Sequence, residues 1–176
     1  DVALQDIEGE KAASLIGAAY AHYTFAAKRE KGKSTVRVYN PTAKDYSWSQ
    51  PHTVIEVVND DMPFLVDSTT AALNQLKLIV HLVIHPMYSC ERDARGNLVR
   101  ILERGASSDK AINESFMRIE INEQPKEKLS EIRNKIEGVL KDIRSSVDDW
   151  SQMRTKMRAI IDELEVHPAD LPVEEV

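Results

Sequence analysis

Three aspartates cluster where an apolar, β-branched run gives way to a helical pattern, and acids so close together could share acid–base chemistry. These are Asp60, Asp61 and Asp67, and paired carboxylates can divide the duties of general acid and general base. A helix start explains them more simply, because Asp60 or Asp61 would cap its free amides and Asp67 would lie in its first turn. Ser68 follows, but neither a nucleophile elbow nor a phosphate-binding glycine loop surrounds it. We therefore predict no catalytic residue in this chain.

Two histidines, His81 and His85, could bind a metal ion if they lay one turn apart on a helix. The residues around them are branched and apolar, which favours a strand. Four residues of strand span about 13 Å, too far for two ligands of one ion, so we expect no metal site. Cys90 is the only cysteine, which leaves no internal disulfide and no thiolate cluster for zinc. We interpret it as a structural thiol.

The acids lie between a strand and a helix that must position them. Residues 54–58 are β-branched except for Glu56, as in a largely buried strand, and an apolar series at helical spacing begins at Leu65. Pro63 suits the first helical turn because it has no N–H to leave unpaired. Free backbone amides at a helix start can also hold a small anion. This junction is our candidate effector-binding or interface turn, made of Asn59, Asp60, Asp61, Met62, Pro63, Phe64, Leu65 and Val66.

The same periodicities outline the remaining elements. Helical spacing predicts an N-terminal helix over residues 10–28, ended by Gly32 and Lys33. Apolar runs predict strands at residues 36–39, 78–90 and 116–121, and a hairpin whose turn is residues 93–97 and whose second strand is residues 98–102. Two apolar stripes predict two C-terminal helices that meet at a kink or corner, because Ser145 and Ser146 followed by acids resemble a helix start.

The order of these elements predicts an α+β fold close to the ferredoxin-like plan, an antiparallel sheet with helices on one face. No strand follows the helix that begins near residue 126, although that plan ends in one. We expect residues 35–39 to take its place beside residues 53–59. Three regions follow: an N-terminal helical extension at 1–33, an α/β domain at 34–144, and a C-terminal helix and linker at 145–176.

Length and charge limit the possible functions. The chain has 176 residues, 42% hydrophobic and 30% charged, which fits one core-forming domain and is too short for a nucleotide-binding domain plus a substrate domain. A net charge of −6 argues against nucleic-acid binding. The densest basic run, Lys28, Arg29, Lys31 and Lys33, is interpreted as a solvated helix end.

No apolar segment is long enough to cross a membrane and no signal segment begins the chain, so we expect a cytoplasmic protein that binds no membrane. The chain starts at Asp1 without a methionine. We expect a piece of a longer polypeptide, with further sequence after Val176.

The strand–turn–helix segment carries a resemblance to a known family. Residues 52–67, together with His85-Pro86 and Arg92-Asp93-Ala94-Arg95-Gly96-Asn97-Leu98, resemble the N-terminal region of the large, bacterial-type NAD-specific glutamate dehydrogenases, over residues 34–165. That region is similar to ACT domains, which are regulatory. Asp61-Met62-Pro63-Phe64-Leu65 also resembles the Asp-x-Pro-Gly-Leu turn through which many ACT domains bind amino acids. Here Phe64 replaces the glycine that would let the backbone approach a ligand closely.

The resemblance implies a non-catalytic regulatory or oligomerisation domain of an NAD-dependent glutamate dehydrogenase, which converts L-glutamate to 2-oxoglutarate and ammonia. NAD would then be bound elsewhere in the parent enzyme, with no cofactor in this fragment. Expected partners are other domains of the same polypeptide, a second copy in a homo-oligomer, and a small amino-acid effector. The alternatives are a stand-alone amino-acid sensor that uses the same turn and a small independent enzyme on a ferredoxin-like sheet.

Overall fold

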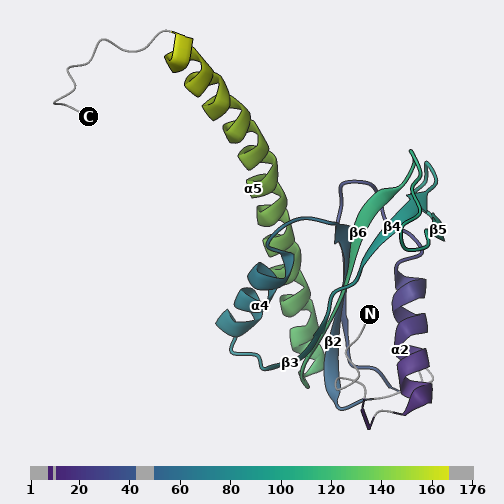
Figure 1. The fold of residues 1–176 in the computed structure, drawn as a ribbon. Coiled ribbons are helices and arrows are strands. Elements are labelled where there is room, and N and C mark those ends of the chain that lie inside the picture. The colour runs from purple at the N-terminus through teal and green to yellow at the C-terminus, as the bar shows by residue number, and fades with distance from the viewer. Residues whose placement is uncertain (1–7, 10, 43–49, 167–176) are drawn as a thin grey trace.

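The computed structural model describes residues 8–9, 11–42 and 50–166, apart from the side chain of residue 151. Within these residues the chain runs α2 (Ala12–Phe25), β1 (Thr35–Tyr39), β2 (His52–Asp60), α4 (Leu65–Gln75), β3 (Val80–Ile84), β4 (Met87–Arg92), β5 (Leu98–Ile101), β6 (Ile112–Asn122) and α5 (Lys126–Val166). The outer parts of the extensions predicted at 1–33 and 145–176 lie outside the described residues. The α+β, ACT-like class is confirmed, with helices α4 and α5 on one face of an antiparallel sheet (Figure 1).

The described strands form one sheet in the order β1-β2-β6-β4-β5, and β3 pairs with β6 as well. Strand β1 lies antiparallel to β2, with Val36 opposite Val57 and Val38 opposite Ile55. The predicted pairing of the early strand with the central strand is therefore confirmed. The β4–β5 hairpin is confirmed too, and its turn closes through a 3.0 Å hydrogen bond from Gly96 N to Asp93 O.

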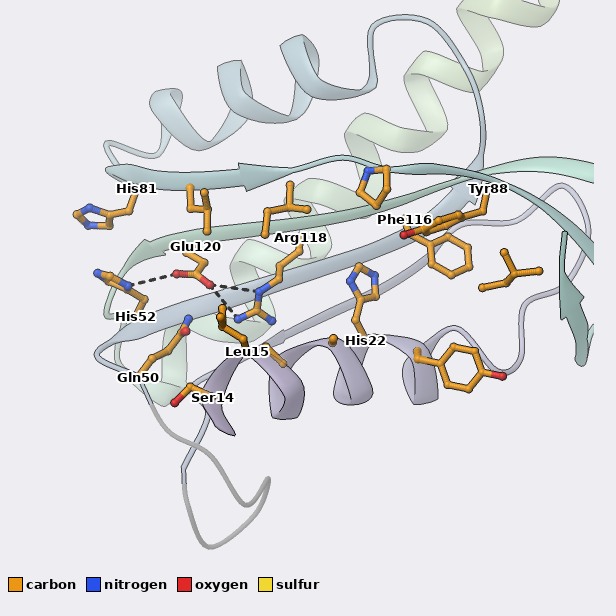
Figure 2. Close-up of a pocket in the computed structure, with 17 residues that line it drawn as sticks. Ser14, Leu15, His22, Gln50, His52, His81, Tyr88, Phe116, Arg118 and Glu120 are labelled. Carbon is orange, nitrogen blue, oxygen red and sulfur yellow. Dashed lines mark hydrogen bonds and ion pairs between the residues drawn. The ribbon is translucent and has the colours of Figure 1, made fainter. Parts of the chain in front are cut away.

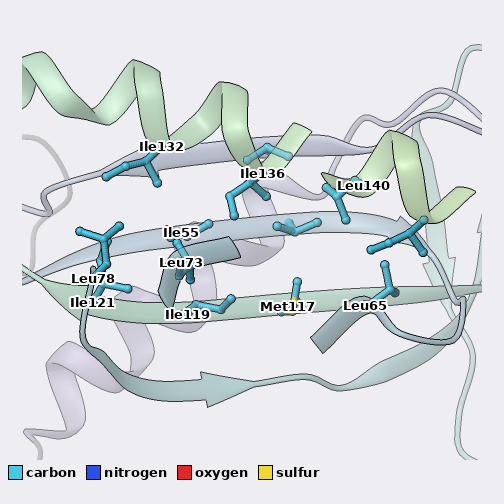
Figure 3. Packing of buried hydrophobic residues seen from close by; sticks show 13 residues of the cluster. Ile55, Leu65, Leu73, Leu78, Met117, Ile119, Ile121, Ile132, Ile136 and Leu140 are labelled. Atoms are coloured by element: carbon cyan, nitrogen blue, oxygen red, sulfur yellow. The ribbon is translucent and has the colours of Figure 1, made fainter. Parts of the chain in front are cut away.

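The hydrophobic core lies between one face of the sheet and helices α4 and α5 (Figure 3). Because side chains alternate along a strand, only every second residue of β2 and β6 enters it. Its members include Ile55, Leu65, Leu73, Met117, Ile119, Ile121, Ile132, Ile136 and Leu140. Each large aliphatic side chain removed from water stabilises the fold by about 1.5–3 kcal/mol.

Helix α2 covers the opposite face of the sheet (Figure 1), so the domain has three layers. It ends at Phe25, earlier than predicted, and none of its residues is buried. The next residues pair with the β4–β5 hairpin instead, since Leu98 N donates to Ala27 O at 2.8 Å and Arg29 N donates to Gly96 O at 2.9 Å. These hairpin contacts replace the last predicted turn of the helix.

The prediction of two C-terminal helices was wrong, because α5 continues without interruption for 41 residues. Ser146 Oγ donates to the carbonyl oxygen of Asp142 at 2.9 Å, one turn earlier in the helix. A serine that bonds to its own helix in this way can lie in a helix interior, so it does not start a second helix.

The apolar run predicted as one strand over residues 78–90 is two strands, β3 and β4, separated at His85 and Pro86. Proline has no N–H for a ladder bond, while Phe116 N donates to Pro86 O at 3.0 Å. Both strands pair with β6, β4 along its first part and β3 along its last part. Pro86 therefore divides the segment that pairs with β6 into two strands but does not end that pairing.

Candidate functional site

The predicted turn differs from expectation at the helix start. Helix α4 begins at Leu65, and Phe64 is its N-cap residue, with φ of 69° and no side-chain cap. Pro63 thus precedes the helix, and neither Asp60 nor Asp61 caps it. Phe64 holds the left-handed conformation that glycine adopts without strain. The residue is 66% exposed.

Asp60 joins the turn to two distant arginines. Arg29 Nη2 lies 2.7 Å from Asp60 Oδ1, and Arg144 Nη1 of α5 lies 2.8 Å from Oδ2. Burial alone would raise the pKa of the Asp60 carboxyl, but hydrogen bonds and charge from Arg29 and then Arg144 outweigh it and hold that pKa below its ordinary value. The Asp60 carboxylate therefore remains ionised, and its ion pair with Arg144 holds helix α5 against the turn.

The other residues of the turn divide between core and solvent. Asn59 is buried, and its Oδ1 accepts a 2.8 Å hydrogen bond from Arg144, while its Nδ2 has no partner among the described residues. Leu65 is buried in the core, and Met62 and Val66 pack against it. Asp61, Pro63 and Phe64 face solvent. The structure thus brings only Asn59 and Asp60 together with a cation.

Arg29 belongs to a buried ion cluster, so its interpretation as part of a solvated helix end was wrong. Its side chain is fully buried and donates to Glu114, which is also buried and accepts from Arg92. Each distance is 2.7 Å. Two guanidinium groups on one carboxylate provide the charge pairing and hydrogen bonds that a buried acid needs. Cys90 lies nearby; burial, and then the charge of Glu114, raises the pKa of its thiol to about 11, as expected of a structural cysteine.

A hollow with a volume of about 590 Å³ lies between α2 and the sheet (Figure 2). Beside it, on the same face of the sheet, lies the fully buried Glu56 of β2. This carboxylate accepts hydrogen bonds from Arg37 Nε at 2.9 Å, Tyr39 Oη at 3.1 Å and Arg118 Nη1 at 3.3 Å. Burial and the adjacent Glu56 carboxylate raise the pKa of Tyr39. Glu56 is therefore held as a structural anion.

Three of the described histidines, His22, His52 and His81, line this hollow. His52 and His81 stack with ring centroids 4.5 Å apart, and His52 Nδ1 lies 3.4 Å from Glu120 Oε2. His85 instead bonds through Nε2 to Ser115 Oγ at 2.6 Å. His22 of α2 points into the hollow, and burial lowers its pKa. In the described part of the chain no three His, Cys, Asp or Glu residues are placed to hold a metal ion.

Sequence reasoning missed the roles of Glu56, Arg118 and His22. Glu56 did give a signal, because it is the one charged residue in the otherwise apolar run 54–58, where a buried acid needs a cation. Nothing in the N-terminal helical pattern marked His22.

No helix of the described residues is long and apolar enough to cross a membrane.

A family model described as "Glutamate dehydrogenase, ACT1 domain" matches residues 1–136. The chain belongs to this family. The α-helix-covered antiparallel sheet is consistent with the ACT1 assignment, and the predicted resemblance is confirmed.

This ACT1 domain is also similar to three NAD-specific glutamate dehydrogenases. It is 33% identical to that of Halomonas elongata over 96% of this chain, and 29% identical to that of Pseudomonas aeruginosa over 99% of it. It is 26% identical to that of Mycobacterium tuberculosis over 82% of it. The matched regions span only 11%, 11% and 9% of the lengths of these relatives.

Proposed function

We propose that this ACT1 domain is a non-catalytic assembly and regulatory domain of a large, cytoplasmic, NAD-dependent glutamate dehydrogenase. The parent reaction would be oxidation of L-glutamate to 2-oxoglutarate and ammonia, with NAD bound in another domain. Support comes from the names of the relatives and from the acids of this chain, since the buried carboxylates are held by arginines rather than poised for proton transfer. Glutamate-dependent reduction of NAD by the isolated chain should be absent.

One observation carries the assembly role. The second half of α5 projects away from the sheet (Figure 1) and keeps an apolar stripe at the 3–4 spacing of a heptad repeat. Its members are Trp150, Met153, Met157, Ile160 and Leu164, each 51–62% exposed. The same stripe is buried against the domain earlier in the helix, at Ile136 and Ile143. An apolar stripe of this length in water favours association with another helix.

A second copy of this chain in antiparallel orientation fits the stripe. In a parallel pair both domains would lie at the same end of the coil and on the facing sides of the helices, where they would collide. An antiparallel pair places the domains at opposite ends. With Met157 opposite Ile160 of the partner subunit, Lys156 lies near Glu163 of the partner subunit, and two-fold symmetry makes this favourable pair twice.

Sedimentation equilibrium across a concentration range tests this pairing. The wild-type chain should dimerise, and Met157→Glu should remain monomeric, whereas the matched control Gln152→Glu, on the outward side of the helix, should dimerise normally. Lys156→Glu should weaken the dimer and the double variant Lys156→Glu/Glu163→Lys should restore it. A wild-type monomer at high concentration would reject self-association and leave other domains of the polypeptide as the partner of this stripe.

An amino-acid effector at the turn is a second candidate, favoured by the unpartnered Nδ2 of Asn59 beside Arg144. A bound amino acid should raise the melting temperature by mass action. Asp61→Ala should remove that rise if the exposed carboxylate contacts the ligand. An unchanged melting temperature across a panel of amino acids would reject the site.

A further inference from the structure

Helix α2 contacts the sheet along only part of its length. Ala18 packs against Tyr39 and Val54, and the His22 ring stacks on Phe116 with centroids 5.9 Å apart, but a hollow remains beside these contacts. No residue of Ala12–Phe25 is buried, although Leu15, Ala18 and His22 line the hollow beneath the helix. Protein interiors rarely contain voids larger than a water molecule. A space of about 590 Å³ instead falls in the usual range of small-molecule sites, about 300–1,000 Å³.

Most of the cavity wall is apolar. Leu15 and Ala18 form the helix side, and Leu82, Ile84 and Phe116 form the sheet side. A ligand with an apolar body would displace water from these side chains, and removal of apolar surface from water favours binding. Apolar side chains provide no hydrogen bonds to a molecule that is polar throughout.

The charged groups of the wall already neutralise one another. Arg118 lies 2.9 Å from Glu120 and 3.3 Å from Glu56, and Glu120 also faces His52 (Figure 2). A ligand with a net charge would have to separate one of these pairs or lie unpaired beside them. Both arrangements leave an uncompensated charge away from water, so the cavity favours an electrically neutral ligand.

Two polar atoms of the wall lack partners among the described residues, His22 Nε2 and Gln50 Nε2. With the ring proton on Nδ1, His22 Nε2 is a hydrogen-bond acceptor. Gln50 Nε2 is an amide nitrogen and therefore a donor. Gln50 and Ser14 lie toward one end of the cavity in Figure 2, and Ser14 and His22 are about 12 Å apart along the helix at 1.5 Å per residue.

We propose that the cavity between α2 and the sheet binds a small, neutral molecule with an apolar body, a hydroxyl or N–H group that donates to His22 and a carbonyl that accepts from Gln50. Binding would fill the space beneath α2 and fix the helix against the sheet. This site is separate from the turn at residues 59–66 and from the stripe on α5. It does not depend on either role.

A matched set of probes tests the proposal on the intact chain by titration calorimetry and melting temperature. N-(4-hydroxyphenyl)acetamide has a hydroxyl and a carbonyl at opposite ends of a ring and should bind with millimolar affinity. N-phenylacetamide lacks the hydroxyl and should bind several-fold more weakly. 4-Acetamidobenzoate replaces the hydroxyl with a carboxylate and should bind at least tenfold more weakly.

Variants locate the binding. Ala18→Leu fills the cavity and should abolish binding, while Ala13→Leu, on the exposed side of the same helix, should not change it. His22→Phe keeps the ring shape and should remove the preference for the hydroxyl-bearing probe, which remains measurable if Ala18→Leu fails to fold. No binding of the first probe, equal binding of the carboxylate, or an unchanged preference in His22→Phe would each overturn the proposal.

Discussion

Arg29 and Glu114 lie 85 positions apart in the chain and form a buried ion pair with a 2.7 Å Nη2–Oε1 distance. The pair joins the segment after α2 to the middle of the sheet, and Asp60 and Arg92 extend it to the turn and the β4–β5 hairpin. One cluster thus fixes the N-terminal segment, the turn and the hairpin relative to one another.

Removal of the Arg29 charge should destabilise the domain strongly. Arg29→Met leaves the fully buried Glu114 with one cation fewer, and loss of one partner of a buried pair costs about 3–5 kcal/mol. Lys31→Met, an exposed position in the same basic run, should change the free energy of unfolding by less than about 0.5 kcal/mol. Urea denaturation measures both. A similar small change in the two variants would contradict the assigned role of Arg29.

Asp60 should contribute to acid sensitivity. Because its pKa is lower in the folded state than its ordinary value of 3.8, the unfolded chain binds protons first as the pH falls. The contribution is complete above the ordinary value and is lost as the pH falls through the folded value. Asp60→Asn should therefore show a shallower loss of stability than the wild type between about pH 5 and pH 2. Parallel curves of urea midpoint against pH would exclude this contribution.

Gly96 should tolerate no side chain. A Cβ there would lie 2.3 Å from the backbone oxygen of Arg29, and its φ of +81° already disfavours other residues. Gly96→Ala should lose about 1–2 kcal/mol from the backbone conformation and about 1–3 kcal/mol more from displacement of Arg29. Gly105 has a similar φ of +87° but open space around it, so Gly105→Ala should show the first loss alone. Equal losses would indicate that the hairpin is not pressed against Arg29.

At position 64, glycine should give a more stable domain than alanine. Phe64→Gly and Phe64→Ala both remove the exposed ring, but only glycine adopts a φ of +69° without strain. The glycine variant should exceed the alanine variant by about 1 kcal/mol in free energy of unfolding. If alanine is the more stable of the two, the turn does not hold a left-handed conformation in solution.

Local patterns in the sequence determined most of the secondary structure and the family. Apolar spacing indicated the central strand and helix α4, Gly96 indicated the hairpin turn, and the absence of a last strand left β1 as the neighbour of β2. These predictions succeed because periodicity and turn chemistry depend on residues close together in the chain. The helix boundaries did less well, since Ser146 can cap a helix or bond within one.

Only the tertiary structure decided which charges are buried and where space remains. Arg29 and Lys31 belong to the same basic run, yet Arg29 is buried in ion pairs with Glu114 and Asp60, whereas Lys31 is exposed to solvent. Likewise the cavity under α2 exists because that helix contacts the sheet along only part of its length, a relationship that no local pattern contains. Burial, ion pairing and cavities depend on residues that meet only after folding, so their physical cause lies in long-range packing.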